Sequence, residues 1–156
     1  DRDSLKQFVA TESWHNPGAL LEEFNARIER GEVVASIVRE GVLAAYLWLN
    51  PGQGSAYLPL VRQHYAFPAG SSTLYNGYTH PLYRGSGHFQ RLIRRLVAWW
   101  FEQNPQGSIH VAVEPGNTAS LHALEKVGFS RVTRLCFTRS LGRIKMDRKD
   151  IEQHAA

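Results

Sequence analysis

The stretch from Thr79 to Phe89 reads THPLYRGSGHF, and it lies between a β-rich run and a strongly periodic helical segment. Residues 72–79 (STLYNGYT) favour a strand, and apolar residues recur at helical spacing from Phe89 to Trp100. Glycines between a strand and a helix let backbone N–H groups approach an anion, and the first helical turn adds unpaired donors. Arg84 adds a full positive charge. The stretch therefore predicts a strand, a glycine-rich turn with the groups that an anion site needs, and a helix in succession.

The glycine spacing of this turn excludes two common nucleotide-binding motifs. The chain has no G-x-x-x-x-G-K-[ST] sequence, and Gln90 stands where G-x-G-x-x-G requires its third glycine. Two interpretations stay open on the turn alone: a pyrophosphate site, and a tight turn whose glycines serve only its geometry.

Upstream of the turn, the pattern predicts a helix followed by a hairpin. We expect the helix over 16–30 and the hairpin strands over 32–38 and 42–49. Residues 57–70 are ambiguous and fit either a short helix or a simple bridge. Gly77 interrupts the strand over 72–79, which indicates a β-bulge or a close backbone approach.

Downstream of the turn, a strand and a helix are each followed by a break. The strand covers 108–113, the helix covers 118–127 and ends at Gly128, and a last strand covers 129–139. The polar, basic tail over 142–156 is expected to be loosely held. This order of elements predicts a mixed α/β domain with one main sheet.

Length and composition indicate one globular domain over 1–156. Hydrophobic residues make up 43% of the chain and charged residues 21%, as in ordinary soluble proteins. No apolar run approaches the roughly 18 residues that a transmembrane helix needs, and no signal-peptide pattern is present. We therefore expect a cytoplasmic protein without a membrane partner. The single cysteine, Cys136, excludes an internal disulfide framework and a multi-cysteine metal site, so we expect no metal.

The positive charge leaves several partner classes open. The chain has 18 Lys and Arg against 14 Asp and Glu, a net charge of +4. This suits an anionic ligand, a nucleic acid or a solvated basic face. A basic module using Arg91, Arg94 and Arg95 would bind nucleic acid, but no helix-turn-helix or aromatic ribonucleoprotein motif is evident. No nucleic-acid partner is therefore expected.

Two motifs together resemble the GNAT superfamily of N-acetyltransferases. Arg84 and Gly87 match the first and fourth positions of its acetyl-CoA signature, [RQ]-x-x-G-x-[GA], while Phe89 departs from the sixth. Residues 117–129 are similar to the family pattern N-x-x-A-x-x-L-Y-E-K-x-G-F. This match rests on five positions: Asn117, Glu125, Lys126, Gly128 and Phe129. The resemblance covers about residues 16–140.

The resemblance implies an α/β (α+β) GNAT-like fold and a reaction. The fold has one mixed, mostly antiparallel central sheet with a splayed parallel pair, flanked by helices. An acetyl group passes directly from acetyl-CoA to an amine in a ternary complex, and the pantetheine arm lies in the splayed gap. The N–H of Gly77 or Tyr78 would polarise the thioester carbonyl. The resemblance places ten residues around the cofactor: Tyr78, Thr79, Arg84, Gly85, Ser86, Gly87, His88, Phe89, Asn117 and Ser120.

The usual acid and base of the family are missing from the matching positions. Leu124 stands where the family often has a tyrosine acid, and about Thr73 where it has a carboxylate base. Glu114, at the end of the strand beside the gap, is our candidate base, directly or through water. Asn117 can bond the pantetheine arm while it caps its helix. The predicted catalytic residues are Gly77, Tyr78, Glu114 and Asn117.

The acceptor is expected to be a small primary amine, with an amino sugar as the leading class. Tyr46, Trp48, Tyr75 and Asn76 give its pocket an aromatic and hydrogen-bonding character. The alternative function is a CoA-binding regulatory or interaction domain without efficient catalysis. Trp99 lies off the apolar helical stripe, so it marks either a homodimer contact or internal packing.

Overall fold

The computed structural model describes residues 2–13, 15–52, 54–58, 63–140 and 143–151. The predicted order of helix, hairpin, strand, glycine-rich turn, helix, strand, helix and strand is present, with a short N-terminal helix, a second hairpin and a C-terminal strand in addition. In chain order the elements are α1 (Arg2–Leu5), α2 (Pro17–Glu29), β1 (Val33–Arg39), β2 (Val42–Asn50), β3 (Ser55–Leu58), β4 (Gln63–Ala66), β5 (Ser71–Thr79), the 3-10 turn η1 (Pro81–Tyr83), α3 (His88–Gln103), β6 (Ser108–His110), α4 (Thr118–Glu125), β7 (Thr133–Ser140) and β8 (Arg143–Asp150).

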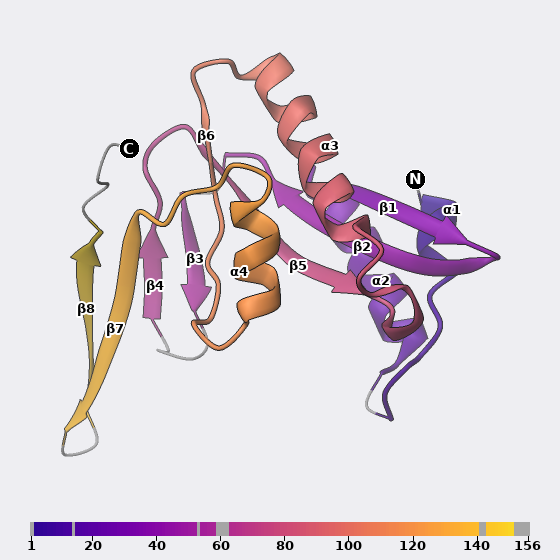
Figure 1. Ribbon diagram of the computed structural model, residues 1–156, viewed down its shortest axis with the longest axis horizontal. Coiled ribbons are helices and arrows are strands. Elements are labelled where there is room, and N and C mark those ends of the chain that lie inside the picture. The colour runs from indigo at the N-terminus through magenta and orange to yellow at the C-terminus, as the bar shows by residue number, and fades with distance from the viewer. Residues whose placement is uncertain (1, 14, 53, 59–62, 141–142, 152–156) are drawn as a thin grey trace.

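The central sheet is mixed, with strand order β1-β2-β5-β6 (Figure 1). The pairs β1–β2 and β2–β5 are antiparallel, whereas β5–β6 is parallel. The parallel pairing runs only from Ser71 opposite Ser108 to Thr73 opposite His110. Beyond it, residues 111–113 leave the ladder although they continue the β-rich sequence. This early separation is the predicted splay, and it opens a gap beside the second half of β5.

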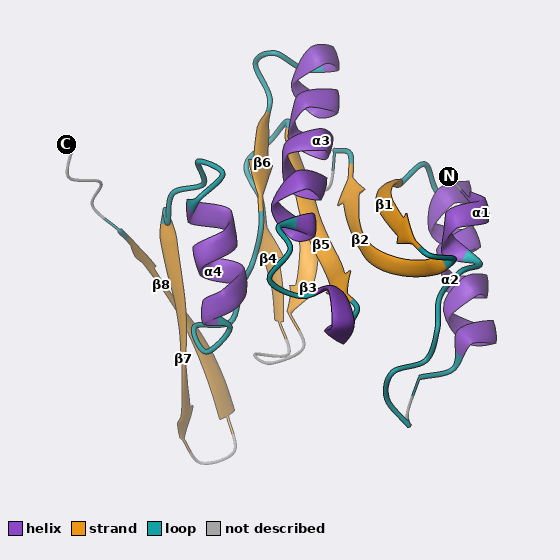
Figure 2. Ribbon diagram, turned by 45° about the vertical axis from the view of Figure 1, so that its right-hand side comes forward, coloured by secondary structure: helices purple, strands orange, loops and turns teal. Residues whose placement is uncertain are grey.

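Helices cover both faces of this sheet (Figure 2). Along β2, Leu47 and Leu49 belong to the core that α3 and α4 close, while Tyr46 and Trp48 belong to the core that α1 and α2 close. The alternation follows from the two-residue period of a strand. Because β2 is buried on both faces, its sequence is apolar almost throughout.

The two longest helices carry the signals that the sequence predicts. In α2, Asn16 caps the first turn, and its Oδ1 accepts a hydrogen bond from the N–H of Ala19 at 3.2 Å. In α3, the apolar stripe through Leu92, Ile93 and Leu96 lies buried against the sheet. Burial of this stripe fixes α3, and with it the turn that precedes the helix.

Two expectations about the chain outside the central sheet are wrong. The ambiguous stretch over 57–70 is neither a short helix nor a simple bridge in its described residues, 57–58 and 63–70, because β3 and β4 pair as an antiparallel hairpin. The tail predicted to be loose instead supplies β8, which pairs with β7 over eight residue pairs. Residues 142 and 152–156 of that tail lie outside the described part.

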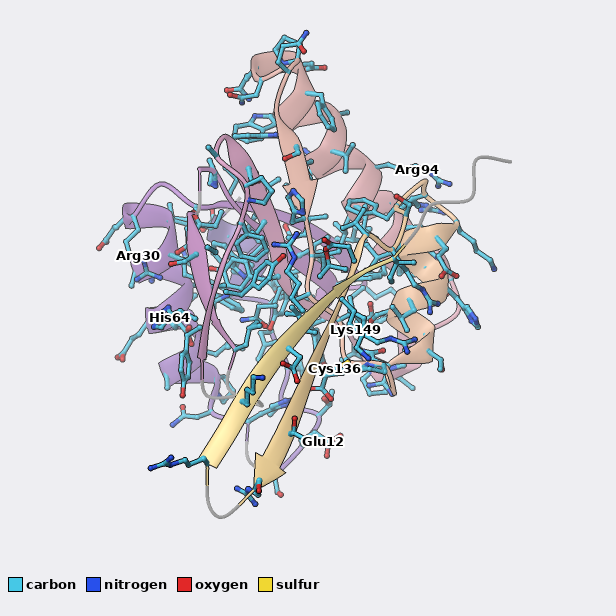
Figure 3. All side chains as sticks on the ribbon, turned by 90° about the vertical axis from the view of Figure 1, so that its left-hand side faces the viewer. Glu12, Arg30, His64, Arg94, Cys136 and Lys149 are labelled. Atoms are coloured by element: carbon cyan, nitrogen blue, oxygen red, sulfur yellow. The ribbon has the colours of Figure 1, made fainter. Side chains whose placement is uncertain are left out.

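The last predicted strand also differs in its start and its partner. The strand begins at Thr133 rather than 129, and it pairs with β8 instead of extending one main sheet. Figure 3 shows this hairpin, with Cys136 and Lys149 labelled, in front of the rest of the molecule. The sequence of β8 is mostly charged and so resembles a solvated tail. Its backbone N–H and C=O groups can nevertheless pair with those of β7, whatever the side chains are. The guanidinium of Arg148 lies 5.8 Å from the Tyr65 ring, which joins β8 to β4.

The described residues contain no helix long and apolar enough to cross a membrane.

Tyr46 gives the core on the α2 side a testable pH dependence. Burial raises the pKa of Tyr46 to about 12, against the opposing effect of the Arg27 guanidinium. A tyrosine in the unfolded chain has a pKa of about 10. The free energy of unfolding therefore stays constant below that pH and decreases as the pH rises towards 12, because the unfolded chain loses the tyrosine proton more easily than the folded chain. The decrease approaches about 2–3 kcal/mol. Urea unfolding of Tyr46→Phe should lack this part of the decline, and an equal decline in the variant would contradict the assignment.

Candidate functional site

The gap between β5 and the chain after β6 contains a cavity of about 270 Å³. It lies where the parallel strands separate, so backbone from both sides borders it. Many residues predicted for the active site line this cavity: Tyr75, Asn76, Gly77, Phe89, Glu114, Asn117, Ser120 and Leu124. The structure therefore gathers at one place residues that lie up to about fifty positions apart in the sequence.

A β-bulge shapes the β5 side of this cavity. Tyr46 pairs with Tyr78, but Trp48 pairs with Tyr75, so Asn76 and Gly77 together stand opposite one residue of β2. This confirms the bulge predicted from Gly77. Asn76 has φ of 46°, which is the left-handed region that few non-glycine residues adopt.

Gly77 is required by a close approach of side chains. A Cβ atom at this position would lie 2.5 Å from Cε2 of Phe89 and 3.1 Å from Cδ1 of Leu47. The Phe89 ring, the departure from the family signature, thus occupies the space beside the glycine. The two residues fit each other, and the backbone of the bulge borders the cavity.

The turn before α3 has the form expected of an anion-binding cradle. Gly85 and Gly87 have φ of 76° and 72°, so both positions need a left-handed backbone. Gly87 is the N-cap of α3 and offers no side-chain hydrogen bond to the first helical turn. Arg84 is exposed, and its Nε donates to the carbonyl of Thr79 at 3.4 Å. With exposed Ser86, these groups fit a diphosphate by charge and by their backbone donors.

His88 lies inside the fold rather than on the surface of the cradle. It is 6% exposed, and its Nδ1 has no hydrogen-bond partner among the described residues. Burial lowers the pKa of His88, and the guanidinium groups of Arg91 and Arg39 lower it further. The imidazole therefore favours its neutral form, and the positive charge of the cradle comes from Arg84.

The lowered pKa of His88 predicts an acid sensitivity. Below the ordinary histidine pKa of about 6.5, the unfolded chain takes up a proton that folded His88 resists, so stability falls as the pH decreases. His88→Gln should remove part of this fall between about pH 7.5 and 5.5 in urea unfolding. The remainder should persist, because burial also lowers the pKa of His110. A pH dependence identical to that of the unsubstituted chain would contradict a neutral His88.

The α4 side of the cavity combines a polar cap with an apolar wall. The Oδ1 of Asn117 accepts a hydrogen bond from the N–H of Ser120 at 3.2 Å, so its amide nitrogen is not used by this cap. Leu124 is buried and offers no proton. Glu114 is exposed at the edge of the cavity, and its backbone carbonyl accepts from the Asn117 N–H at 2.9 Å. Its role as a base stays a prediction.

The four residues predicted for the acceptor pocket separate into two groups. Tyr46 and Trp48 lie in the core, with 4% and 0% exposure, where Tyr46 stacks on Tyr78 at 5.4 Å between ring centroids. Tyr75 and Asn76 border the cavity, and the Tyr75 hydroxyl donates to the Glu32 carboxylate. Tyr46 and Trp48 could contact an acceptor only if the residues that cover them moved away.

Arg27 is a residue of this region that the sequence analysis did not select. It is 6% exposed, and its guanidinium carbon lies 5.2 Å from the Trp48 ring and 5.0 Å from the Tyr75 ring. Its Nη2 lies 2.5 Å from Oε1 of Glu23, one helical turn earlier. An arginine placed beside Phe24 and Ile28 on the apolar face of α2 is the signal that could have found it.

Two other features of the described residues lie outside this cavity. Trp99 is partly buried against the core under α3, which explains its position by internal packing.

A second cavity of about 490 Å³ lies between α3, β6, α4 and β7 and has a mostly apolar lining. It shares only Leu124, Val111 and Val113 with the cavity in the gap. Within the described ranges, no group of three or more His, Cys, Asp or Glu residues could hold a metal ion.

Several solved structures share this fold. The acetyltransferase yncA from Salmonella typhimurium, solved with acetyl-CoA, superposes with a TM-score of 0.57 at 20% identity, covering 91% of this chain and 78% of that one. A ribosomal-protein-alanine N-acetyltransferase from Brucella melitensis gives 0.55 at 20% identity, with 96% and 89% covered. AAC(6')-Iy, bound to the bisubstrate analogue CoA-S-monomethyl-acetylneamine, gives 0.60 at 18% identity, with 82% of each chain covered. A search of curated protein sequences gave no significant match.

The family comparison agrees with the two motifs and with the splayed sheet. Residues 3–129 match the family model described as the acetyltransferase (GNAT) family. This match includes the bulge of β5, the glycine turn, α3 and α4. Because it covers most of the chain, the chain belongs to the acetyltransferase (GNAT) family of enzymes.

Proposed function

We propose that this protein transfers the acetyl group of acetyl-CoA to the primary amine of a small molecule. The observation that carries this proposal is the position of Phe89, which follows the glycine turn directly in the first turn of α3 and lines the same cavity as the Gly77 bulge. The turn supplies the donors and charge that a CoA diphosphate needs, and the gap supplies a partly apolar channel for its pantetheine arm. Structural relatives whose descriptions include acetyl-CoA or a CoA conjugate support this choice.

The residues of the chain suit direct transfer in a ternary complex. The backbone N–H of Gly77 or Tyr78 donates to the thioester carbonyl and stabilises the negative charge that develops there. The amine nitrogen attacks the carbonyl carbon, the C–S bond breaks, and the amine proton passes to Glu114 or to water beside it. The departing thiolate takes its proton from solvent, because Leu124 has none to give. Orientation within the gap supplies much of the rate.

An amino sugar is our leading class of acceptor. The acceptor side of the bulge presents the amide of Asn76 and the ring of Tyr75, which suit hydroxyl groups and the flat face of a sugar. The acetylneamine part of the analogue bound to AAC(6')-Iy supports this class by analogy.

A panel of amines tests the proposal. Purified protein is mixed with acetyl-CoA and separately with amino sugars, amino acids, polyamines and an alanine-terminated peptide, and acetylated products are identified by mass spectrometry. The proposal predicts turnover with at least one small amine, strongest among the amino sugars. CoA binding without transfer to any amine would favour the regulatory domain instead. Transfer only to the peptide would reject the small-molecule acceptor.

A further inference from the structure

Arg27 is a buried cation whose position is fixed from several directions. It leaves α2 on the side that faces the sheet, where the rings of Trp48 and Tyr75 lie against its guanidinium. Glu23 accepts from its Nε at 3.2 Å and from its Nη2 at 2.5 Å. A buried arginine is costly unless its charge and donors are all used. The other N–H groups of Arg27 therefore also need hydrogen-bond acceptors.

These remaining N–H groups donate to the side chain of Asn76, in the bulge of β5. With its amide oxygen turned towards the guanidinium, Asn76 accepts from Nη1 of Arg27 at 2.7 Å and from Nη2 at 2.8 Å. Nη2 thus serves both Glu23 and Asn76. We call this chain of contacts, Glu23–Arg27–Asn76, the α2–bulge bridge. It joins a helix on the acceptor side to the residue immediately before Gly77.

The bridge explains why an asparagine occupies a left-handed position. Glycine would adopt φ of 46° without strain, whereas another residue holds it only where its surroundings compensate. Asparagine is among the residues that tolerate this region best, and its amide supplies the acceptor that Arg27 needs. The side chain of Asn76 is therefore used to anchor the backbone rather than only to line the cavity.

We infer that Arg27 is a positioning residue for acetyl transfer, holding the bulge so that the N–H groups after Asn76 face the thioester carbonyl. This inference rests on the proposed function of the gap, because it assigns Arg27 a role in that reaction. Arg27 is enclosed by rings and carboxylate and acts through Asn76, not on the substrates themselves. Loss of the bridge leaves the diphosphate cradle intact and lets the bulge relax.

Kinetics of four variants test the inference with the acceptor found in the amine panel. Arg27→Met fills the space between the rings but removes the donors, and Asn76→Gly keeps the backbone conformation accessible but removes the acceptor. Each should lower kcat by about tenfold or more while Kd for CoA changes by less than about threefold. The double variant should be no worse than the worse single one, because both break the same contact. Asn76→Asp, which keeps two acceptor oxygens for Arg27, should restore kcat to within about threefold.

Two further measurements separate the possible failures. Arg95→Met removes an exposed arginine of α3 with the same change in charge and should leave kcat unchanged. Scalar couplings that report φ at residue 76 need no turnover: Arg27→Met should move Asn76 out of the left-handed region. Absence of acetyl transfer by the unsubstituted protein would reject the proposed function, while the couplings still test the bridge. If Arg27→Met does not fold, the kcat values of Asn76→Gly and Asn76→Asp still test the inference, because only the first of these variants removes the acceptor of Arg27. Unchanged kcat in Asn76→Gly, multiplying losses in the double variant, or an unchanged φ at Asn76 in Arg27→Met would overturn the inference.

Discussion

Gly77→Ala is expected to lower kcat/KM for acetyl transfer by roughly 100-fold. The new Cβ would lie 2.5 Å from Cε2 of Phe89, far inside van der Waals contact. The ring has two ways to relieve this clash: it moves into the cavity that would hold the pantetheine arm, or it pushes the bulge away from its position. Either movement disturbs the place where the thioester must meet the backbone donors. Steady-state kinetics with saturating acceptor measures the effect.

A second substitution tests whether the clash itself causes this loss. Phe89→Leu in the Gly77→Ala background shortens the side chain that the methyl group meets, so it should recover at least about tenfold of the activity. Gly54→Ala is the matched control, since its Cβ would meet no atom within 4 Å, and its activity should equal that of the unsubstituted chain. Full activity in Gly77→Ala would mean that neither the ring nor the bulge needs its present position.

Arg84→Glu is expected to raise Kd for acetyl-CoA by about 30-fold or more. The substitution replaces the cation of the cradle with an anion beside the expected diphosphate. The glycine backbone donors remain, so binding should weaken strongly without any change in the fold. Isothermal titration calorimetry measures the constant directly.

A charge-matched control distinguishes a local effect from a general one. Arg94→Glu makes the same change in net charge on exposed α3, two helical turns beyond the cradle. Its Kd should stay within about threefold of the unsubstituted value, because exposed charges at that distance are largely screened. Equal losses in both variants would show that acetyl-CoA responds to the overall charge and not to the glycine turn.

Local sequence signals predicted the parts of the fold that surround the site. The period of α3, the cap at Asn16 and the break at Gly77 depend on neighbours in the chain, and each was confirmed. The hairpin of β1 and β2 followed from two β-rich runs and a short turn. The two motifs placed the glycine turn and α4 beside one gap, since the family resemblance supplied the long-range order that spacing alone lacks.

Features that depend on partners distant in the sequence could not be predicted in the same way. Alternation placed Tyr46 and Trp48 on one face of a strand, but only packing against α2 shows that this face is buried. The β8 strand has the composition of a solvated tail, and its ladder with β7 leaves little trace in the sequence. Arg27 looked like an ordinary helical arginine, because its partners lie on β2 and β5.

A crystal structure of the protein with acetyl-CoA tests the central claim most directly. We expect the diphosphate to lie against Arg84 and the N–H groups of the turn before α3. We also expect the pantetheine arm in the gap between β5 and residues 111–113, with the thioester carbonyl facing the N–H of Gly77 or Tyr78. Acetyl-CoA bound elsewhere, for example in the larger apolar cavity beside β7, or a thioester facing away from the bulge, would contradict the account.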